Sequence, residues 1–252
     1  MPRHPLAQFK KADSERRCRT IGLSVGEVGT GKTSFWLTAP GPIFVASLDK
    51  GLEGIIEEHA GKKEIYFKEY DWSAGKEDFS QEYAVEVRDE ILRDYEIALE
   101  HARTIVFDKE TSIWEVFRYA EFGGPTDAPK DYAKLNQRYI NLINMAKAGS
   151  VNFGLIQSMK NEWGSYTNPT TGKKSGAPTG ERVPVGFSQA NELVYVEMLH
   201  RRQVVKDGPS EFYFDIGKCR QNTALQDQTF PACSFSEFGQ LLIEGSEEGD
   251  WQ

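Results

Sequence analysis

Short apolar runs alternate with amphipathic segments along most of the chain, and this alternation predicts an α/β protein. Buried strands are expected where an uninterrupted apolar run lies between turn-forming residues. Their ranges are 20–25, 42–48, 64–70, 104–107 and 151–156. Helices are expected where apolar residues recur at the spacing of one helix face. Their ranges are 32–40, 52–59, 80–103 and 129–148.

The pattern changes in the second half of the chain. Residues 158–189 are polar and rich in Gly, Thr, Pro and Lys, which predicts one long loop. A loop of that length in a compact domain is usually functional or disordered. Three more strands are expected at 192–200, 203–205 and 212–216. The expected fold is therefore a doubly wound α/β domain, with a mostly parallel sheet flanked by helices and with antiparallel C-terminal strands.

The composition is that of an ordinary globular protein with one hydrophobic core. The 252 residues are 39% hydrophobic and 27% charged, and no apolar run approaches the roughly 18 residues that a membrane span needs. No apolar signal segment follows the first residues. The three cysteines lack CxxC spacing, which indicates reduced thiols and not a disulfide frame or a zinc site. We therefore expect a cytoplasmic location and no membrane partner.

The net charge of −8 is unevenly distributed along the chain. Residues 1–19 hold six Lys or Arg against two acidic residues, whereas residues 244–252 hold four acidic residues and no basic one. We therefore divide the chain into a basic N-terminal arm (1–19), the α/β domain (20–243) and an acidic C-terminal tail (244–252). Two interpretations of these ends stay open: contacts with charged partners, or solvated disordered termini.

A glycine-rich segment between the first expected strand and the first expected helix carries the strongest chemical signal. Its sequence GEVGTGKT matches the P-loop pattern GxxxxGK[ST] in full, and backbone N–H groups of such a loop surround phosphates. Lys32 is expected to contact the β- and γ-phosphates, and Thr33 to bind Mg²⁺. The sequence therefore predicts a nucleoside triphosphate site, with ATP and Mg²⁺ as its ligands. The expected phosphate-binding residues are Gly26, Glu27, Val28, Gly29, Thr30, Gly31, Lys32, Thr33 and Ser34.

Asp108 directly follows the expected strand 104–107, where a carboxylate can hold Mg²⁺ through water in the Walker B role. An ordinary strand end or helix cap is the alternative. The next residue is Lys109, although many AAA+ and helicase motors place their water-activating Glu at that position. Two residues remain as candidates for the base: Asp49, at the end of the second strand, and Glu110.

The order of these features resembles the RecA-type ATPase core: P-loop, a strand ending in an acid, Walker B, and a strand ending in Gln157. Over about residues 18–222 the chain is similar to phage-encoded RecA-like proteins of the Sak-type single-strand-annealing recombinase group. That resemblance implies a RecA-like P-loop fold and an ATP-dependent recombinase or annealing protein. It also implies a homo-oligomer, ring or filament, that binds single-stranded DNA and hydrolyses ATP between subunits.

The resemblance also implies roles for individual residues. Asp49 takes the place of the catalytic Glu of RecA-type cores, although its side chain is one methylene shorter, and a plain turn residue is the alternative. Gln157 takes the place of the residue that senses the γ-phosphate and couples it to a DNA-binding loop. Lys218 and Arg220 are similar to the cation pair that such proteins insert into a neighbour's site, and a solvated basic turn is the alternative.

The polar stretch 158–189 takes the place of the second DNA-binding loop in this comparison. Its cations can follow phosphates while its aromatic rings stack on unpaired bases. The candidate contacts are Lys160, Trp163, Tyr166, Lys173, Lys174 and Arg182, with Phe187 as a further aromatic side chain. A first such loop is expected at 118–131. A mobile surface loop is the plain alternative, and a single-strand-binding protein is a further candidate partner.

Two other functions stay open. One is an assembly protein that binds ATP with little hydrolysis, and the other is a motor accessory such as a helicase loader or packaging ATPase. Within the basic arm, Leu6 and Phe9 suit docking on a neighbouring subunit.

Overall fold

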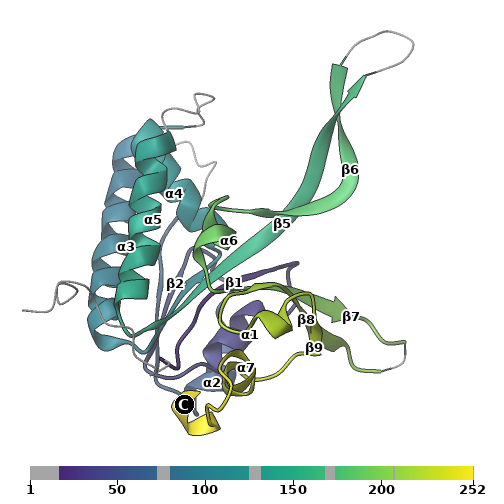
Figure 1. Ribbon diagram of the computed structural model, residues 1–252. Helices are drawn as coiled ribbons and strands as arrows, with labels where there is room; N and C mark the ends of the chain where they lie inside the picture. The colour runs from purple at the N-terminus through teal and green to yellow at the C-terminus, as the bar shows by residue number, and fades with distance from the viewer. Residues whose placement is uncertain (1–16, 73–79, 125–131, 168–173, 207, 252) are drawn as a thin grey trace, which may run out of the picture.

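The computed structural model describes residues 17–72, 80–124, 132–167, 174–206 and 208–251. Most of the basic arm, with Leu6 and Phe9, lies outside these residues, as does Lys173. A nine-stranded sheet runs through the centre of the domain in the order β3-β2-β4-β5-β1-β7-β8-β9, and β6 pairs with β5 outside this row (Figure 1).

The first part of the sheet is parallel. Its strands are β1 (Ile21–Gly26), β2 (Ile43–Ser47), β3 (Ile65–Glu69), β4 (Thr104–Asp108) and the start of β5 (Asn152–Thr167). β7 (Val196–Gln203) continues the parallel arrangement beside β1, whereas β8 (Glu211–Cys219) and β9 (Thr229–Pro231) are antiparallel. The predicted fold class is therefore confirmed, and β5 separates the strand of the P-loop from the strand of Asp108.

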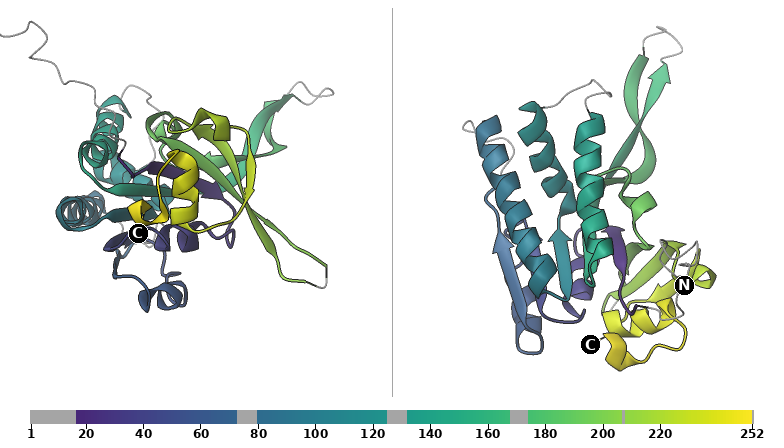
Figure 2. Two further views of the ribbon diagram at one scale, coloured as in Figure 1. Left: turned by 60° about the horizontal axis from the view of Figure 1, so that its bottom comes forward. Right: turned by 60° about the vertical axis from the view of Figure 1, so that its left-hand side comes forward.

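Helices cover both faces of the sheet (Figure 2). One face carries α3 (Gln81–His101), α4 (Glu110–Phe122) and α5 (Tyr132–Ala148), and the other carries α1 (Lys32–Leu37), α2 (Ile55–Ala60) and α7 (Phe235–Leu242). Leu23 and Val25 belong to the first core and Trp36 to the second. Trp36 packs so close to β5 that a Cβ at Gly154 would lie 2.5 Å from its ring, which requires glycine there.

The long helix α3 forms where its apolar periodicity predicts it. Its buried residues recur along one face. They are Ala84, Val87, Ile91, Tyr95 and Ala98. The hydroxyl of Ser80 accepts a hydrogen bond from the N–H of Tyr83 and caps the first turn.

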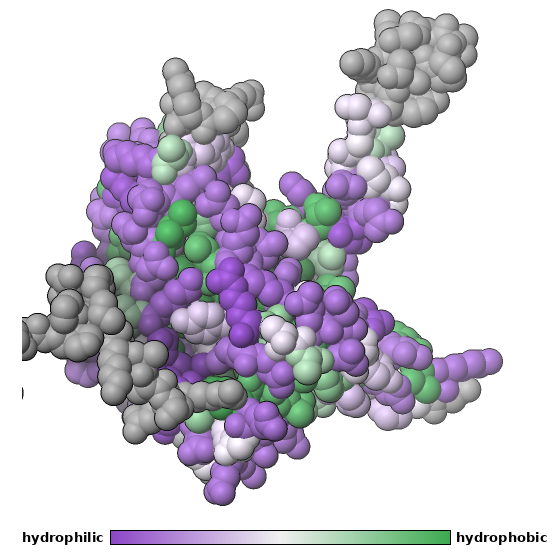
Figure 3. All heavy atoms as spheres, viewed as in Figure 1, coloured by the Kyte–Doolittle hydropathy of each residue, from purple (hydrophilic) through white to green (hydrophobic). Residues whose placement is uncertain are grey.

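The prediction of one long loop at 158–189 is wrong for most of that range. The outer part of β5 pairs antiparallel with β6 (Lys174–Val185), from Ser158 opposite Val185 to Thr167 opposite Lys174. We call residues 158–167 and 174–185 the β5–β6 hairpin; these two strands project from the body of the domain (Figure 3). Most of its described side chains are exposed, so no alternation of apolar and polar residues marks it as strand.

Three other expectations also need correction. Helix α4 occupies the start of the expected loop 118–131, and residues 125–131 lie outside the described part. The segment expected as strand 192–200 begins instead in the short helix α6 (Ala190–Leu193), and the expected strand 203–205 is absent because β7 ends at Gln203. Among the described residues, no helix combines the length and the apolar character that crossing a bilayer requires.

The expected acidic tail folds onto the domain. Residues Glu248–Trp251 form the 3-10 helix η4, and the side chain of Trp251 is fully buried. Its indole packs directly over α7, where a Cβ at Gly239 would come within 2.2 Å of the ring. This apolar anchor was not expected in a segment defined by its acidic residues, and it makes the described end of the chain part of the domain.

Candidate nucleotide-binding site

The P-loop connects the carboxyl end of β1 to α1. Gly29 and Gly31 have φ angles of 74° and 83°, which non-glycine residues rarely adopt. The ammonium of Lys32 donates hydrogen bonds to the carbonyls of Gly26, at 2.9 Å, and of Glu27, at 2.6 Å. Burial lowers the pKa of Lys32, whereas the nearby Asp108 and Glu27 carboxylates raise it. The loop thus surrounds the Lys32 ammonium, and the Asp108 and Glu27 carboxylates favour its charged form.

Two oxygen donors of the predicted metal site meet in the structure. The hydroxyl of Thr33 donates to Asp108 Oδ1 at 3.0 Å, although the two residues come from α1 and the end of β4. Burial raises the pKa of Asp108, and Asp49 raises it further, while the Thr33 hydroxyl and the lysines 32 and 109 lower it. A hydroxyl and a carboxylate next to a phosphate loop are the hard oxygen ligands that Mg²⁺ prefers. The two residues therefore fit a Mg²⁺ ion shared with phosphate oxygens.

Asp49 lies beside this pair but has its own partner. Its carboxylate forms a 3.1 Å ion pair with the ammonium of Lys109, and both side chains are about half exposed. The turn is fixed by Ser47, whose hydroxyl bonds both the N–H and the carbonyl of Asp49. The structure thus places Asp49 near Asp108, as the order of strands predicts, and its role as a base stays a prediction.

Glu110 and Gln157 lie together in the core between the sheet and helices α3, α4 and α5. The Gln157 amide donates to one carboxylate oxygen of Glu110 at 2.8 Å, and the N–H of Phe187 donates to the other at 3.2 Å. Glu110 is fully buried, and a Cβ at Gly186 would lie 2.1 Å from its carboxylate. Both side chains are therefore held on the α3–α5 side of the sheet. The γ-phosphate-sensing role of Gln157 stays a prediction.

We expect the stability of the protein to depend on the charge of Glu110. Burial raises the pKa of Glu110 from 4.5 to about 7, although hydrogen bonds from its neighbours lower it. Between these values the folded chain holds a proton that the unfolded chain has lost, so stability falls as the pH rises from about 4.5 to 7. Over this pH range the free energy of unfolding falls by about 3 kcal/mol. Glu110→Gln should flatten this part of the curve in urea unfolding at several pH values, whereas a parallel curve would contradict the assignment.

Phe187 also belongs to this buried cluster. Its ring lies 4.9 Å from the rings of both Trp114 and Tyr139 and is 1% exposed. The suggestion that Phe187 stacks on nucleic-acid bases is therefore wrong. The chain turns inward at Gly186, and a sequence pattern alone does not show where a hairpin rejoins the core.

A hollow adjoins the P-loop beside Phe212, and no sequence pattern predicts it. The ring of Phe212, from β8, lies 3.7 Å from the Cβ position of Gly31 and is 37% exposed. It lines a space of about 230 Å³ over the loop and an adjoining space of about 490 Å³. The second space is also bordered by Ser34, His59, Cys233 and Glu237. No local motif marks Phe212, because it reaches the loop only through the pairing of β8 with β7.

The candidate nucleic-acid contacts are spread along the β5–β6 hairpin. Lys160 and Trp163 are exposed, Trp163 by 66%. The backbones of Tyr166 and Lys174 lie in the paired strands, and their side chains are outside the described part. The Arg182 side chain points back to the P-loop and forms an ion pair with Glu27. Their roles as nucleic-acid contacts stay predictions.

Arg220 lies at the amino ends of the parallel strands and Lys218 two residues before it, both away from the P-loop at the carboxyl ends. In the strand register, Lys218 of β8 stands opposite Glu197 of β7, which stands opposite Leu23 of β1. The backbone N–H of Arg220 donates to the carbonyl of Tyr195. Both side chains donate to carbonyls of α6, Lys218 to Asn191 and Arg220 to Glu192. The structure therefore does not bring this pair to the P-loop of its own chain.

Comparison with known proteins adds little to this picture. No protein-family model and no curated protein matches the sequence. Among solved structures, a KaiC-like protein from the hyperthermophilic archaeon Pyrococcus horikoshii shares 16% identity and has a TM-score of 0.47, with 84% of each chain covered. The assignment of the RecA-like P-loop fold therefore stands on the strand order and on the position of the loop between β1 and α1.

Proposed function

We propose that the protein is an ATPase that binds single-stranded DNA with its β5–β6 hairpin and acts in recombination or strand annealing as a homo-oligomer. The observation that carries the proposal is the 3.0 Å contact of Thr33 with Asp108 beside a complete P-loop. It joins a phosphate-binding loop to a carboxylate suited to Mg²⁺, which is the arrangement that phosphoryl transfer needs.

The bound nucleotide would extend from the loop toward β8. Its phosphates would lie against the N–H groups of the loop and the Lys32 ammonium, and Mg²⁺ would be held by Thr33 and Asp108. The base would enter the hollow beside Phe212, where an aromatic ring supplies a stacking surface. Mg²⁺ would offset phosphate charge, while the protein supplies orientation.

A second candidate function is an ATP-binding assembly protein or motor accessory with little hydrolysis. The observation that favours it is that both candidate bases already have partners. Asp49 pairs with Lys109, and Glu110 is buried against Gln157. A base that activates water must reach that water in the reacting complex.

The nucleic-acid part of the proposal rests on the exposed hairpin. It carries Lys160 for phosphates and Trp163 as a stacking ring, and its strands β5 and β6 extend away from the helices (Figure 1). Stacking on an aromatic ring is tolerant of sequence, and therefore suits an annealing protein.

Two surfaces support an oligomer. Lys218 and Arg220 can serve a nucleotide only in another copy of the chain, since they lie away from their own loop. Beside the edge strand β3, a hollow of about 500 Å³ is bordered by the exposed side chains of Tyr66, Phe67 and Ile97. The apolar residues of another copy's N-terminal arm would fit there.

The deciding experiment is ATP turnover with and without a single-stranded oligonucleotide. At saturating ATP, we expect turnover that the oligonucleotide raises. Lys160→Gln should lower the salt slope of oligonucleotide binding by about one, and Trp163→Ala should weaken binding roughly tenfold. Lys62→Ala, an exposed lysine outside the hairpin, is the control. Nucleotide binding without turnover in either condition would instead favour the assembly protein.

A further inference from the structure

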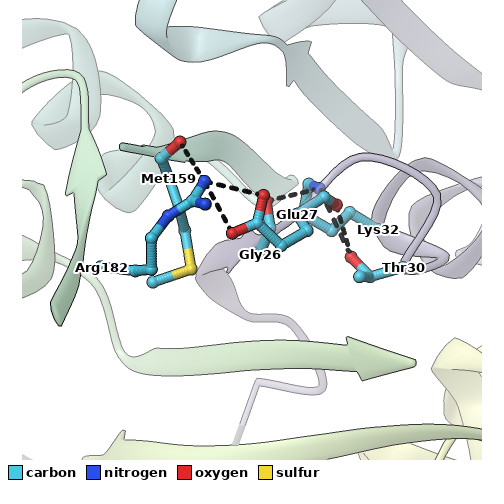
Figure 4. Close-up of polar contacts among 6 residues, drawn as sticks. All are labelled: Gly26, Glu27, Thr30, Lys32, Met159 and Arg182. Atoms are coloured by element: carbon cyan, nitrogen blue, oxygen red, sulfur yellow. Dashed lines mark hydrogen bonds and ion pairs between the residues drawn. The ribbon is translucent and has the colours of Figure 1, made fainter. Parts of the chain in front are cut away.

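An ion pair joins the P-loop to the β5–β6 hairpin. Arg182 Nη2 lies 2.7 Å from Glu27 Oε1 and 2.9 Å from Oε2, so it bridges both carboxylate oxygens (Figure 4). The same nitrogen donates to the carbonyl of Met159 at 3.1 Å, which ties it to the opposite strand of the hairpin. The two partners are 155 residues apart in the sequence. The contact therefore links two parts of the site that no local motif connects.

Glu27 places a negative charge in a loop that is built to bind a polyanion. Its carboxylate is within electrostatic reach of the Lys32 ammonium: burial lowers the pKa of Lys32, whereas Asp108 and then Glu27 raise it. Without a counter-charge, the Glu27 carboxylate would repel the phosphates that Lys32 attracts. Arg182 supplies that counter-charge.

The position of Arg182 depends on the root of the hairpin. Arg182 stands opposite Asn161 in the β5–β6 ladder, three residues before the end of β6. At that end the hydroxyl of Thr111, at the start of α4, donates to the carbonyl of Val185 and accepts from the N–H of Ser158. A movement of the hairpin about this root would carry the Arg182 guanidinium with it.

We propose that Arg182 is a positioning residue of the nucleotide site, which neutralises Glu27 and so makes the affinity of the P-loop for a polyphosphate depend on the position of the hairpin. This inference rests on the nucleotide binding proposed above. A nucleic-acid phosphate that draws Arg182 away leaves Glu27 uncompensated and weakens nucleotide binding. By linkage, bound nucleotide opposes that withdrawal to the same degree.

The exposure of the ion pair suits this role. The Arg182 side chain is 43% exposed and the Glu27 side chain 50%. Such pairs add little to folding stability and are screened by salt, so a competing anion can open this one. For the same reason, neutral substitutions at either position should leave the fold intact, which thermal unfolding would verify.

The test is a double-substitution cycle on the affinity for a non-hydrolysable ATP analogue with Mg²⁺, measured by calorimetry at low salt. Arg182→Gln should weaken binding by about three- to tenfold, because it leaves the Glu27 charge unpaired. Glu27→Gln should not weaken binding. In the Glu27→Gln background, adding Arg182→Gln should have no further effect, since the charge to be neutralised is gone.

Arg93→Gln is the matched control, since it removes an exposed arginine from α3 without touching Glu27 or the hairpin, and it should leave the affinity unchanged. An equal loss from Arg182→Gln in both backgrounds would overturn the inference, because Arg182 would then contact the phosphates directly. Unchanged affinity in Arg182→Gln would overturn it as well. If the unsubstituted protein binds no analogue at all, the proposed function fails first and the inference with it.

Discussion

Lys32→Ala is expected to lower ATP turnover by about 10²- to 10³-fold and to weaken nucleotide binding. Among the described residues, the Lys32 ammonium is the one cation inside the P-loop. Its hydrogen bonds to the carbonyls of Gly26 and Glu27 hold it against the backbone of the loop. Removing it takes away a charge-assisted bond to the phosphates that grows stronger as charge moves toward the leaving group. Steady-state turnover and calorimetry with the ATP analogue measure the two effects.

Lys62→Ala provides a matched control for this prediction. Lys62 is exposed after α2 and lies outside the loop, so its loss removes the same side chain without changing the site. Turnover in Lys32→Ala equal to that of the control would refute the assignment of the P-loop as the active nucleotide site.

Arg220→Ala is expected to reduce turnover by roughly 10³-fold while leaving the affinity of an isolated subunit for nucleotide nearly unchanged. The reason is its position: Arg220 lies at the amino end of β1, away from its own P-loop, so any γ-phosphate that it reaches belongs to another copy. A guanidinium there would stabilise charge in the transition state and contribute little to ground-state binding.

Subunit mixing makes this prediction sharper. Asp108→Asn removes a proposed Mg²⁺ ligand, and Arg220→Ala removes the proposed partner group, so each protein alone should be nearly inactive. Mixed oligomers contain interfaces with an intact P-loop on one side and an intact Arg220 on the other, so turnover should partly return on mixing. Arg201→Ala, on the neighbouring strand β7, is the control arginine. Co-assembly without any recovery would contradict a shared site.

The position of the P-loop could be predicted because its sequence signal is local. The motif fixes the loop, and the carboxyl ends of parallel strands meet at one edge of a sheet, which brings Asp108 to Thr33. The strand order therefore explains why Thr33 and Asp108, which were predicted separately, lie side by side. The helices on either side follow from apolar periodicity for the same reason: neighbouring residues carry the whole signal.

Two features beside the P-loop could not be predicted because they depend on distant pairing. Phe212 reaches the loop through β8, and Arg182 reaches Glu27 through a hairpin whose exposed faces leave no apolar pattern. The burial of Trp251 could not be predicted either, because its neighbours in the sequence are acidic. In each case the contact is fixed by tertiary structure and not by the local sequence.

Strand β5 connects the hairpin to the centre of the sheet. It is one continuous strand, Asn152–Thr167, whose first part lies between β1 and β4 and whose last part forms the hairpin. A load on the hairpin is therefore delivered to the middle of the sheet, between the strand that ends at Gly26 and the strand that ends at Asp108. Because the buried part of β5 is fixed in register between β1 and β4, a displacement of the hairpin acts on the same backbone that lies between Gly26 and Asp108.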